Sequence, residues 1–139
     1  LPDHYPAQDY GRVFDRAQAT GTGVVGIRVL AGGALSGSAD RHPIAGAPPT
    51  PIGSGGSYDA DVERARRLLP LVPEGFAESL TEAATRFAIS HPAMGTILVG
   101  MATPLQFEQA LAAAQKGPLP QIALDRLTAL QQSFASELQ

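Results

Sequence analysis

Two short apolar segments, VVGIRVL at 24–30 and TILVG at 96–100, alternate along the chain with segments of helical periodicity. The first is too short and too rich in β-branched residues for a helix, and it is apolar on both faces apart from Arg28, which is typical of a buried parallel strand. Because parallel strands need crossover connections that are usually helical, this alternation predicts an α/β fold. Two strands cannot close a sheet, so we expect their edges to be covered by structure outside this chain.

Helices are predicted before, between and after the strands, over about 8–20, 59–71, 80–90, 104–116 and 121–138. Gly21 ends the first, Asp59 caps the second, Ser79 and Glu82 form a capping box for the third, and Thr103 caps the fourth. The apolar residues expected on their buried faces are Tyr10, Val13, Phe14, Ala17, Val62, Ala65, Leu68, Leu69, Leu80, Ala83, Ala84, Phe87, Ala88, Phe107, Ala110, Leu111, Ala114, Leu124, Leu127, Leu130, Phe134 and Leu138.

The composition is that of a globular domain and excludes several classes of function. The chain has 139 residues, a net charge of −3 and no cysteine. An acidic chain offers no basic surface for nucleic acid, and the missing thiols exclude disulfides and thiolate catalysis. No apolar run approaches the length of about 20 residues that spans a bilayer, so we expect no membrane contact and a cytoplasmic location.

Both predicted strands run into loops that suit an anionic ligand. LAGGALSG follows the first strand and GMATP follows the second, and ligands of α/β folds bind at the carboxyl ends of strands. Gly32, Gly33 and Gly37 let backbone N–H groups approach an anion, and the helix start at Thr103 makes a second such site. The alternative, that the glycines simply turn the chain, stays open. The GSGGS segment at 53–57 is not read as a phosphate loop because no strand precedes it.

The segments VVGIRVLAGGALSG and EAATRFAISHPAMGTILVGMATPLQFEQALAA, in this order and separation, resemble the C-terminal part of the aldo-keto reductases. The resemblance implies the last two β/α units of a (β/α)8 TIM barrel that uses NADP(H) or NAD(H) to reduce carbonyl compounds or oxidise alcohols. It makes residues 1–139 a partial domain, with a seventh strand, a long loop over 38–58, and an eighth strand between helices.

By this resemblance the cofactor lies along both loops. The first loop would follow its pyrophosphate through Leu30, Gly32, Gly33, Leu35 and Ser36, and the second would hold its adenosine end through Met101, Ala102, Thr103 and Gln106.

Some positions depart from the family pattern. Gln106 stands where many members carry Arg, and Gln109 and Ala110 replace a Glu-Asn pair, which weakens any preference for NADPH over NADH. Arg28 replaces a strand-end Ser and could contact an anion or form a structural ion pair.

The family's Asp, Tyr, Lys and His catalytic set is not expected in this chain, and no residue is assigned to catalysis. The single lysine, Lys116, lies in the last turn of a helix, where a cation is favourable. Tyr5, Tyr10 and Tyr58 read as surface or packing residues, the histidines show no metal-ligand spacing, and the carboxylates around Asp59 read as helix-start charges. The loop 38–58 is placed to reach over the substrate pocket, with Tyr58 or Arg41 at its lip.

A whole barrel of this kind takes about 250 residues, so we expect the chain to be a C-terminal piece that is inactive alone. Its partners would be the cofactor and either the other part of the barrel or a second copy of itself. The alternatives are a non-catalytic dinucleotide-binding or self-associating module, and a product with residual structure only.

Overall fold

A computed structural model describes residues 12–50 and 56–136 of the chain. The helices and strands are α1 (Val13–Thr20), β1 (Val24–Gly26), α2 (Tyr58–Arg66), α3 (Leu80–Ala88), β2 (Met94–Ile97), α4 (Pro104–Gln115) and α5 (Gln121–Ser136). Short 3₁₀ segments lie at η1 (Ala31–Ser36), η2 (Pro43–Ala45) and η3 (Leu69–Leu71). The order is the α/β alternation that the sequence predicts, with η2 inside the long loop.

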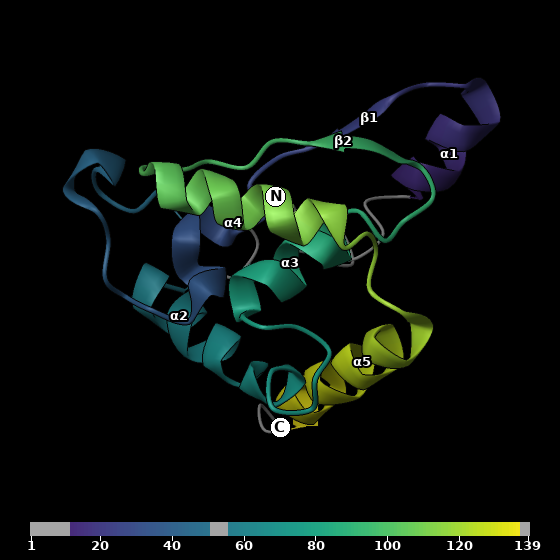
Figure 1. Cartoon of the computed structure of the whole chain (residues 1–139). Coiled ribbons are helices and arrows are strands. Elements are labelled where there is room, and N and C mark those ends of the chain that lie inside the picture. The colour runs from purple at the N-terminus through teal and green to yellow at the C-terminus, as the bar shows by residue number, and fades with distance from the viewer. Residues whose placement is uncertain (1–11, 51–55, 137–139) are drawn as a thin grey trace.

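The two strands pair directly and in parallel, as predicted. Val24 lies opposite Met94 and Gly26 opposite Ile97, with an irregularity after Val24. Figure 1 shows the strands side by side along the top of the molecule, with α2 and α5 at the bottom. This pairing brings the loops that follow the two strands to the same end of the sheet.

The strands are shorter than the apolar runs that predict them. β1 ends at Gly26 rather than residue 30, because Arg28 takes a positive φ of 56° and Ala31 one of 49°, which the extended backbone does not allow. β2 begins at Met94 and ends at Ile97 rather than covering 96–100.

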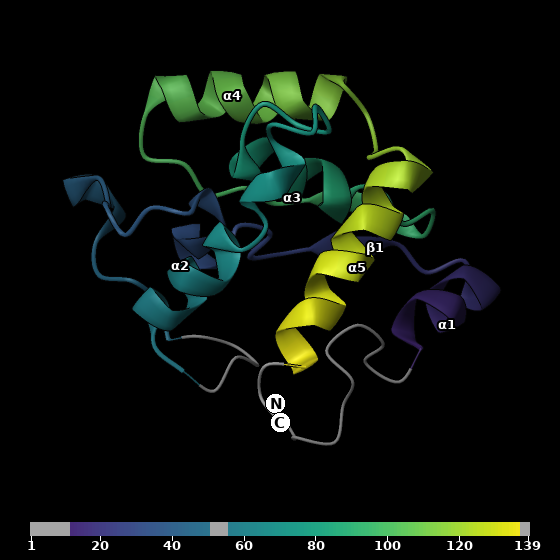
Figure 2. The same cartoon turned by 90° about the horizontal axis from the view of Figure 1, so that it is seen from below.

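The prediction of a buried first strand is wrong. Val25 is 55% exposed and Ile27 66% exposed, because no described element covers that side of the strand pair. The core lies instead among η3, α3 and α5, with Leu71, Ala83 and Leu127 at its centre. Figure 2, seen from below, shows α5 crossing in front of this part of the fold.

The helix starts are predicted well, with one correction. Ser57, not Asp59, caps α2: its side chain accepts a hydrogen bond from the Ala60 N–H, and Asp59 lies in the first turn. Ser79 caps α3 and Thr103 caps α4, both as predicted. The serine precedes the acidic first turn, so its short hydroxyl reaches a free N–H that Asp59 cannot reach from inside the helix.

The buried faces are predicted less well. Val62, Ala65, Leu80 and Ala83 are buried as expected. The residues Val13, Leu69, Phe87, Phe107 and Leu111 are about half exposed and Ala114 is exposed, so these predictions are wrong. In α4 the buried residue is Ala113, and α4 packs on α3, because small side chains let two helices approach closely. Tyr10 and Leu138, and the side chain of Phe134, lie outside the described residues.

Within the described ranges, no helix combines the length and the apolar character that crossing a membrane requires.

Candidate cofactor site

A pocket of about 730 Å³ lies between the loop after β1, the segment 40–49 and the loop after β2. In Figure 1 the segment carrying η2 (blue) lies near the N-terminal end of α4. The structure brings most of the sequence-predicted cofactor residues to this pocket, whose lining includes Leu30, Gly32, Gly33, Ser36, Met101, Ala102 and Gln106. Two loops that are far apart in the sequence therefore share one concave site.

Leu35 and Thr103, also predicted to bind cofactor, do not line this pocket. Leu35 lines a separate apolar cavity of about 110 Å³ on the core side, together with Leu71 and Leu127. Thr103 is occupied as the cap of α4, since its Oγ1 accepts a hydrogen bond of 3.2 Å from the Gln106 N–H. Leu35 is thus a packing residue, and Thr103 shapes the start of the helix.

The glycine loop after β1 is a series of tight turns with left-handed backbone. Gly32 has φ 69° and Gly33 has φ 107°, conformations that favour glycine. The Gly33 N–H donates to the Leu30 carbonyl at 2.8 Å, and the Gly37 N–H donates to the Ala34 carbonyl at 3.0 Å. These two N–H groups are used inside the loop, so they are not the anion donors that the sequence suggested.

The glycines also make room for the segment that folds over them. A Cβ atom at Gly32 would lie 2.5 Å from Pro49 Cγ, and one at Gly33 would lie 3.1 Å from Tyr58 Oη and 3.2 Å from Arg41 Nη1. Distances below about 3 Å are not tolerated between carbon atoms whose contact optimum is about 3.5–4.0 Å. Sequence reasoning missed this role, because it depends on a contact across the long loop.

Hydrogen bonds hold the loop after β2 against the first turn of α4. Gln106 Oε1 accepts a hydrogen bond of 2.6 Å from the Ala102 N–H, in addition to the bond between the Gln106 N–H and Thr103. Gln109 and Ala110, where the sequence departs from the family pattern, line the pocket one turn further along α4. The α4 side chains that line the pocket are therefore uncharged.

Two arginine side chains bring positive charge to the pocket. Arg28 and Arg41 both line it, and Asp40 and His42 lie nearby in the same lining. Arg28 Nη1 donates to the Thr50 carbonyl at 3.2 Å. Within residues 12–50 and 56–136, neither guanidinium makes an ion pair, so the structural ion pair considered for Arg28 is not found there.

Arg41 and Tyr58 both line the pocket and contact each other. The sequence analysis expected one of the two at the lip of a substrate pocket. Arg41 Nη1 donates to Tyr58 Oη at 3.3 Å, and the guanidinium carbon lies 5.2 Å from the centre of the tyrosine ring. This is cation–π geometry, and it fixes both side chains. Tyr58 is therefore a partner of Arg41 at this wall of the pocket.

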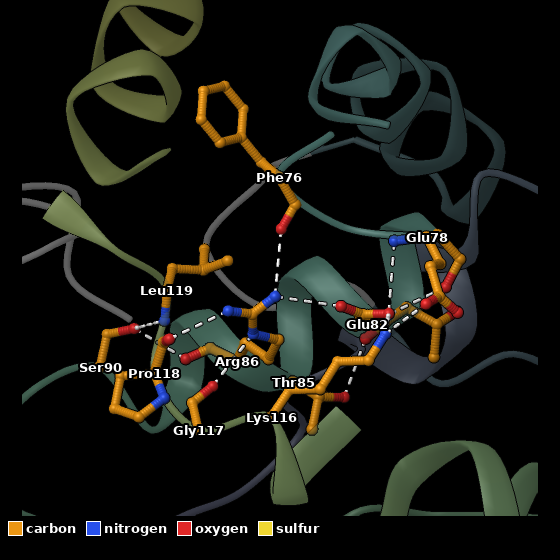
Figure 3. A network of polar contacts seen from close by, with 12 residues as sticks. Phe76, Glu78, Glu82, Thr85, Arg86, Ser90, Lys116, Gly117, Pro118 and Leu119 are labelled. Carbon is orange, nitrogen blue, oxygen red and sulfur yellow. Dashed lines mark hydrogen bonds and ion pairs between the residues drawn. The ribbon is translucent and has the colours of Figure 1, made fainter. Parts of the chain in front are cut away.

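Lys116 is part of a structural network, shown in Figure 3, that ties α3 to the chain on either side of it. Lys116 Nζ contacts Glu78 at 2.7 Å and the buried Glu82 at 2.8 Å. Arg86 donates to Glu82 at 3.1 Å and also to the carbonyls of Phe76, Gly117 and Pro118. The Lys116 side chain is therefore held in place by ion pairs with two glutamates.

The network shifts the pKa values of its charged groups. Burial alone would raise the pKa of Glu82, but hydrogen bonds from Lys116, the Glu78 N–H and Arg86 outweigh it and hold that pKa below its ordinary value. Hydrogen bonds to Glu78 and then Glu82 raise the pKa of Lys116. A raised pKa keeps the lysine protonated, which is unlike a lysine tuned for proton transfer at neutral pH.

No cluster of metal-ligating side chains occurs among the residues that the structure describes. His42 Nδ1 accepts from the Ile44 N–H at the start of η2, and His91 stacks on Phe14 with ring centres 4.2 Å apart. Both histidines therefore have local structural contacts.

Comparison with protein-family models gives a match. The model of the family described as "Aldo/keto reductase family" matches residues 5–132, which is most of the chain. No curated protein matches it.

Proposed function

The chain belongs to the aldo/keto reductase family, and on that premise we propose that it is the dinucleotide-binding part of an NAD(P)H-dependent oxidoreductase. The family implies a TIM barrel, and this chain contributes two parallel strands with their helices. The pocket between the strand-end loops is the proposed cofactor site. The reaction would be carbonyl reduction or alcohol oxidation.

The observation that carries this proposal is the position of the pocket. It lies where the loops after both parallel strands meet, which is where barrels and open α/β sheets bind phosphate-bearing ligands. Its volume also falls within the range of about 300–1,000 Å³ that is usual for ligand and cofactor sites.

The residues present fit a nicotinamide dinucleotide, although by side chains more than by backbone N–H groups. Arg28 and Arg41 offer positive charge for phosphate, and Leu30, Gly32, Gly33 and Ser36 form the adjoining wall. Met101, Ala102 and Gln106 would face the adenosine end. When bound, the cofactor supplies a hydride; the described residues bind and orient it.

We expect no turnover by the chain alone. Lys116 is held between two carboxylates, and Tyr58 is held by Arg41, so neither is available to pair as a proton-donating Tyr–Lys couple. The catalytic Asp, Tyr, Lys and His would come from the part of the barrel that carries the other strands.

Binding is tested by titrating the purified 139-residue chain with NADH and NADPH and following nicotinamide fluorescence and heat. We expect saturable binding that Ala110→Trp, on the pocket wall, abolishes. Ala112→Trp, on the exposed side of the same helix, is the matched control. A folded, monodisperse chain that binds neither nucleotide, or binds equally well in both variants, would contradict the proposal.

The exposed strand residues favour a second candidate, a self-associating module without catalysis. Val25, Ile27 and Leu98 are all more than half exposed beside the paired strands. Apolar patches of this kind drive association. Light scattering of wild type and of Ile27→Lys distinguishes them: a stable oligomer that the variant dissociates, together with no nucleotide binding, supports the module.

A further inference from the structure

We propose that Arg41 binds a phosphate group of the nucleotide in this pocket and sets much of its affinity. The inference rests on the proposed function and deepens it, since it names the ligand group that one side chain recognises. The family resemblance did not name Arg41 among the cofactor residues, because Arg41 lies in the long loop and not in the two strand-end segments that carry the resemblance.

The first argument is that the guanidinium is held rigidly at the pocket wall. Its Nε donates to the Gly46 carbonyl at 3.1 Å, and its Nη2 donates to the Ala45 carbonyl at 3.3 Å. Its Nη1 donates to the Gly32 carbonyl and to Tyr58 Oη. Arginine has five N–H donors, so these four contacts leave one Nη2 N–H for a ligand. A cation fixed in this way loses little entropy when an anion binds.

The second argument is the charge. The acceptors that hold Arg41 are neutral carbonyls and a phenol, and no carboxylate forms an ion pair with it in the described ranges. Asp40 lines the same pocket without an ion pair to either guanidinium, and Arg28 adds a second positive charge. In a chain of net charge −3, the described lining of this pocket therefore carries a surplus of positive charge, two arginines against one aspartate.

The third argument is that one backbone donor on each strand-end loop is already used. The Gly33 N–H and the Ala102 N–H, one on each strand-end loop, are both used within their own loops. Guanidinium groups suit phosphate oxygens best among side chains, so an anion bound between these loops gains a charge-assisted partner in an arginine that lines the pocket. Of the two arginines, Arg41 is the one anchored directly to the glycine loop.

The test compares Arg41→Gln, Arg41→Lys and the control Arg66→Gln. Arg66 also donates to this loop, to the Gly37 carbonyl at 2.8 Å, but it does not line the pocket. Dissociation constants for NADH and NADPH are measured at low and high salt, with circular dichroism to check folding. We expect Arg41→Gln to weaken binding about 10- to 100-fold, Arg41→Lys to lose less, and Arg66→Gln to change little.

The outcomes are distinct. Equal losses for NADH and NADPH identify the pyrophosphate as the group bound, and a loss for NADPH alone identifies the 2′-phosphate. Arg41→Lys binding as poorly as Arg41→Gln shows that loop structure, not charge, matters, and overturns the inference. Arg41→Gln binding like Arg66→Gln also overturns it. If the wild-type chain binds neither nucleotide, the proposed function itself fails.

Discussion

Replacing Glu82 by Gln should be one of the most destabilising near-isosteric changes in this fold. The Glu82 side chain is 9% exposed and accepts hydrogen bonds from Lys116 at 2.8 Å, Arg86 at 3.1 Å and the Glu78 N–H at 3.3 Å. A glutamine keeps one acceptor oxygen and turns an NH₂ group toward donors. It leaves Arg86, 13% exposed, without its counter-charge. Breaking a buried pair in this way costs about 3 kcal/mol, a large share of a total stability of about 5–15 kcal/mol.

The assay is urea unfolding of the full chain, followed by circular dichroism, with Glu78→Gln as the control. Glu78 contacts the same Lys116 at 2.7 Å, but its side chain is 83% exposed. Exposed pairs contribute little, so its loss should be much smaller. Equal shifts of the unfolding midpoint in the two variants would refute the view that burial of Glu82 gives this network its importance.

The network also predicts how stability depends on pH. The pKa of Glu82 is lowered by folding, so its contribution is present above its unfolded pKa and disappears as the pH falls through the folded value. The pKa of Lys116 is raised, so its contribution is lost only as the pH rises through that raised value. Unfolding curves of wild type should therefore lose stability in acid, and Glu82→Gln should lose less, because a hydrogen bond from Arg126 also lowers the pKa of Glu74 and leaves part of the acid loss in place. An unchanged acid response in the variant would assign it to other groups.

Two further substitutions test the local geometry by the same unfolding assay. Gly32→Ala should cost clearly more than Gly21→Ala: both have positive φ, but only at Gly32 would the Cβ meet Pro49, and similar costs would show that Pro49 does not pack there. Ser57→Ala should cost about 1 kcal/mol and Asp59→Ala less, because Ser57 is the cap of α2, and the reverse order would restore Asp59 to that role.

Patterns local in the sequence predicted local structure. The capping residues Ser79 and Thr103 and the turn at Gly21 act as their positions indicate, because a cap depends on groups within one turn of the helix. The parallel pairing of the strands also followed, since helical crossovers allow little else.

Predictions that depend on tertiary packing were less accurate. Phe107 and Leu111 have helical spacing, but α4 turns its alanine side toward α3, and periodicity alone does not say which side meets a neighbour. The same limit applies to Val25 and Ile27, because an apolar strand is buried only where another element covers it.

For the candidate site, too, the sequence predicted the local features and the tertiary structure decided the long-range contacts. The sequence by itself determined which loops meet, since both follow parallel strands, and it named glycines that the turns of the first loop require. Only the tertiary structure decided what those glycines accommodate and where the positive charge lies. Arg41 reaches Gly32 and Tyr58 through the fold of the long loop. These contacts join residues 9 and 17 positions apart across the long loop, and no local propensity encodes them.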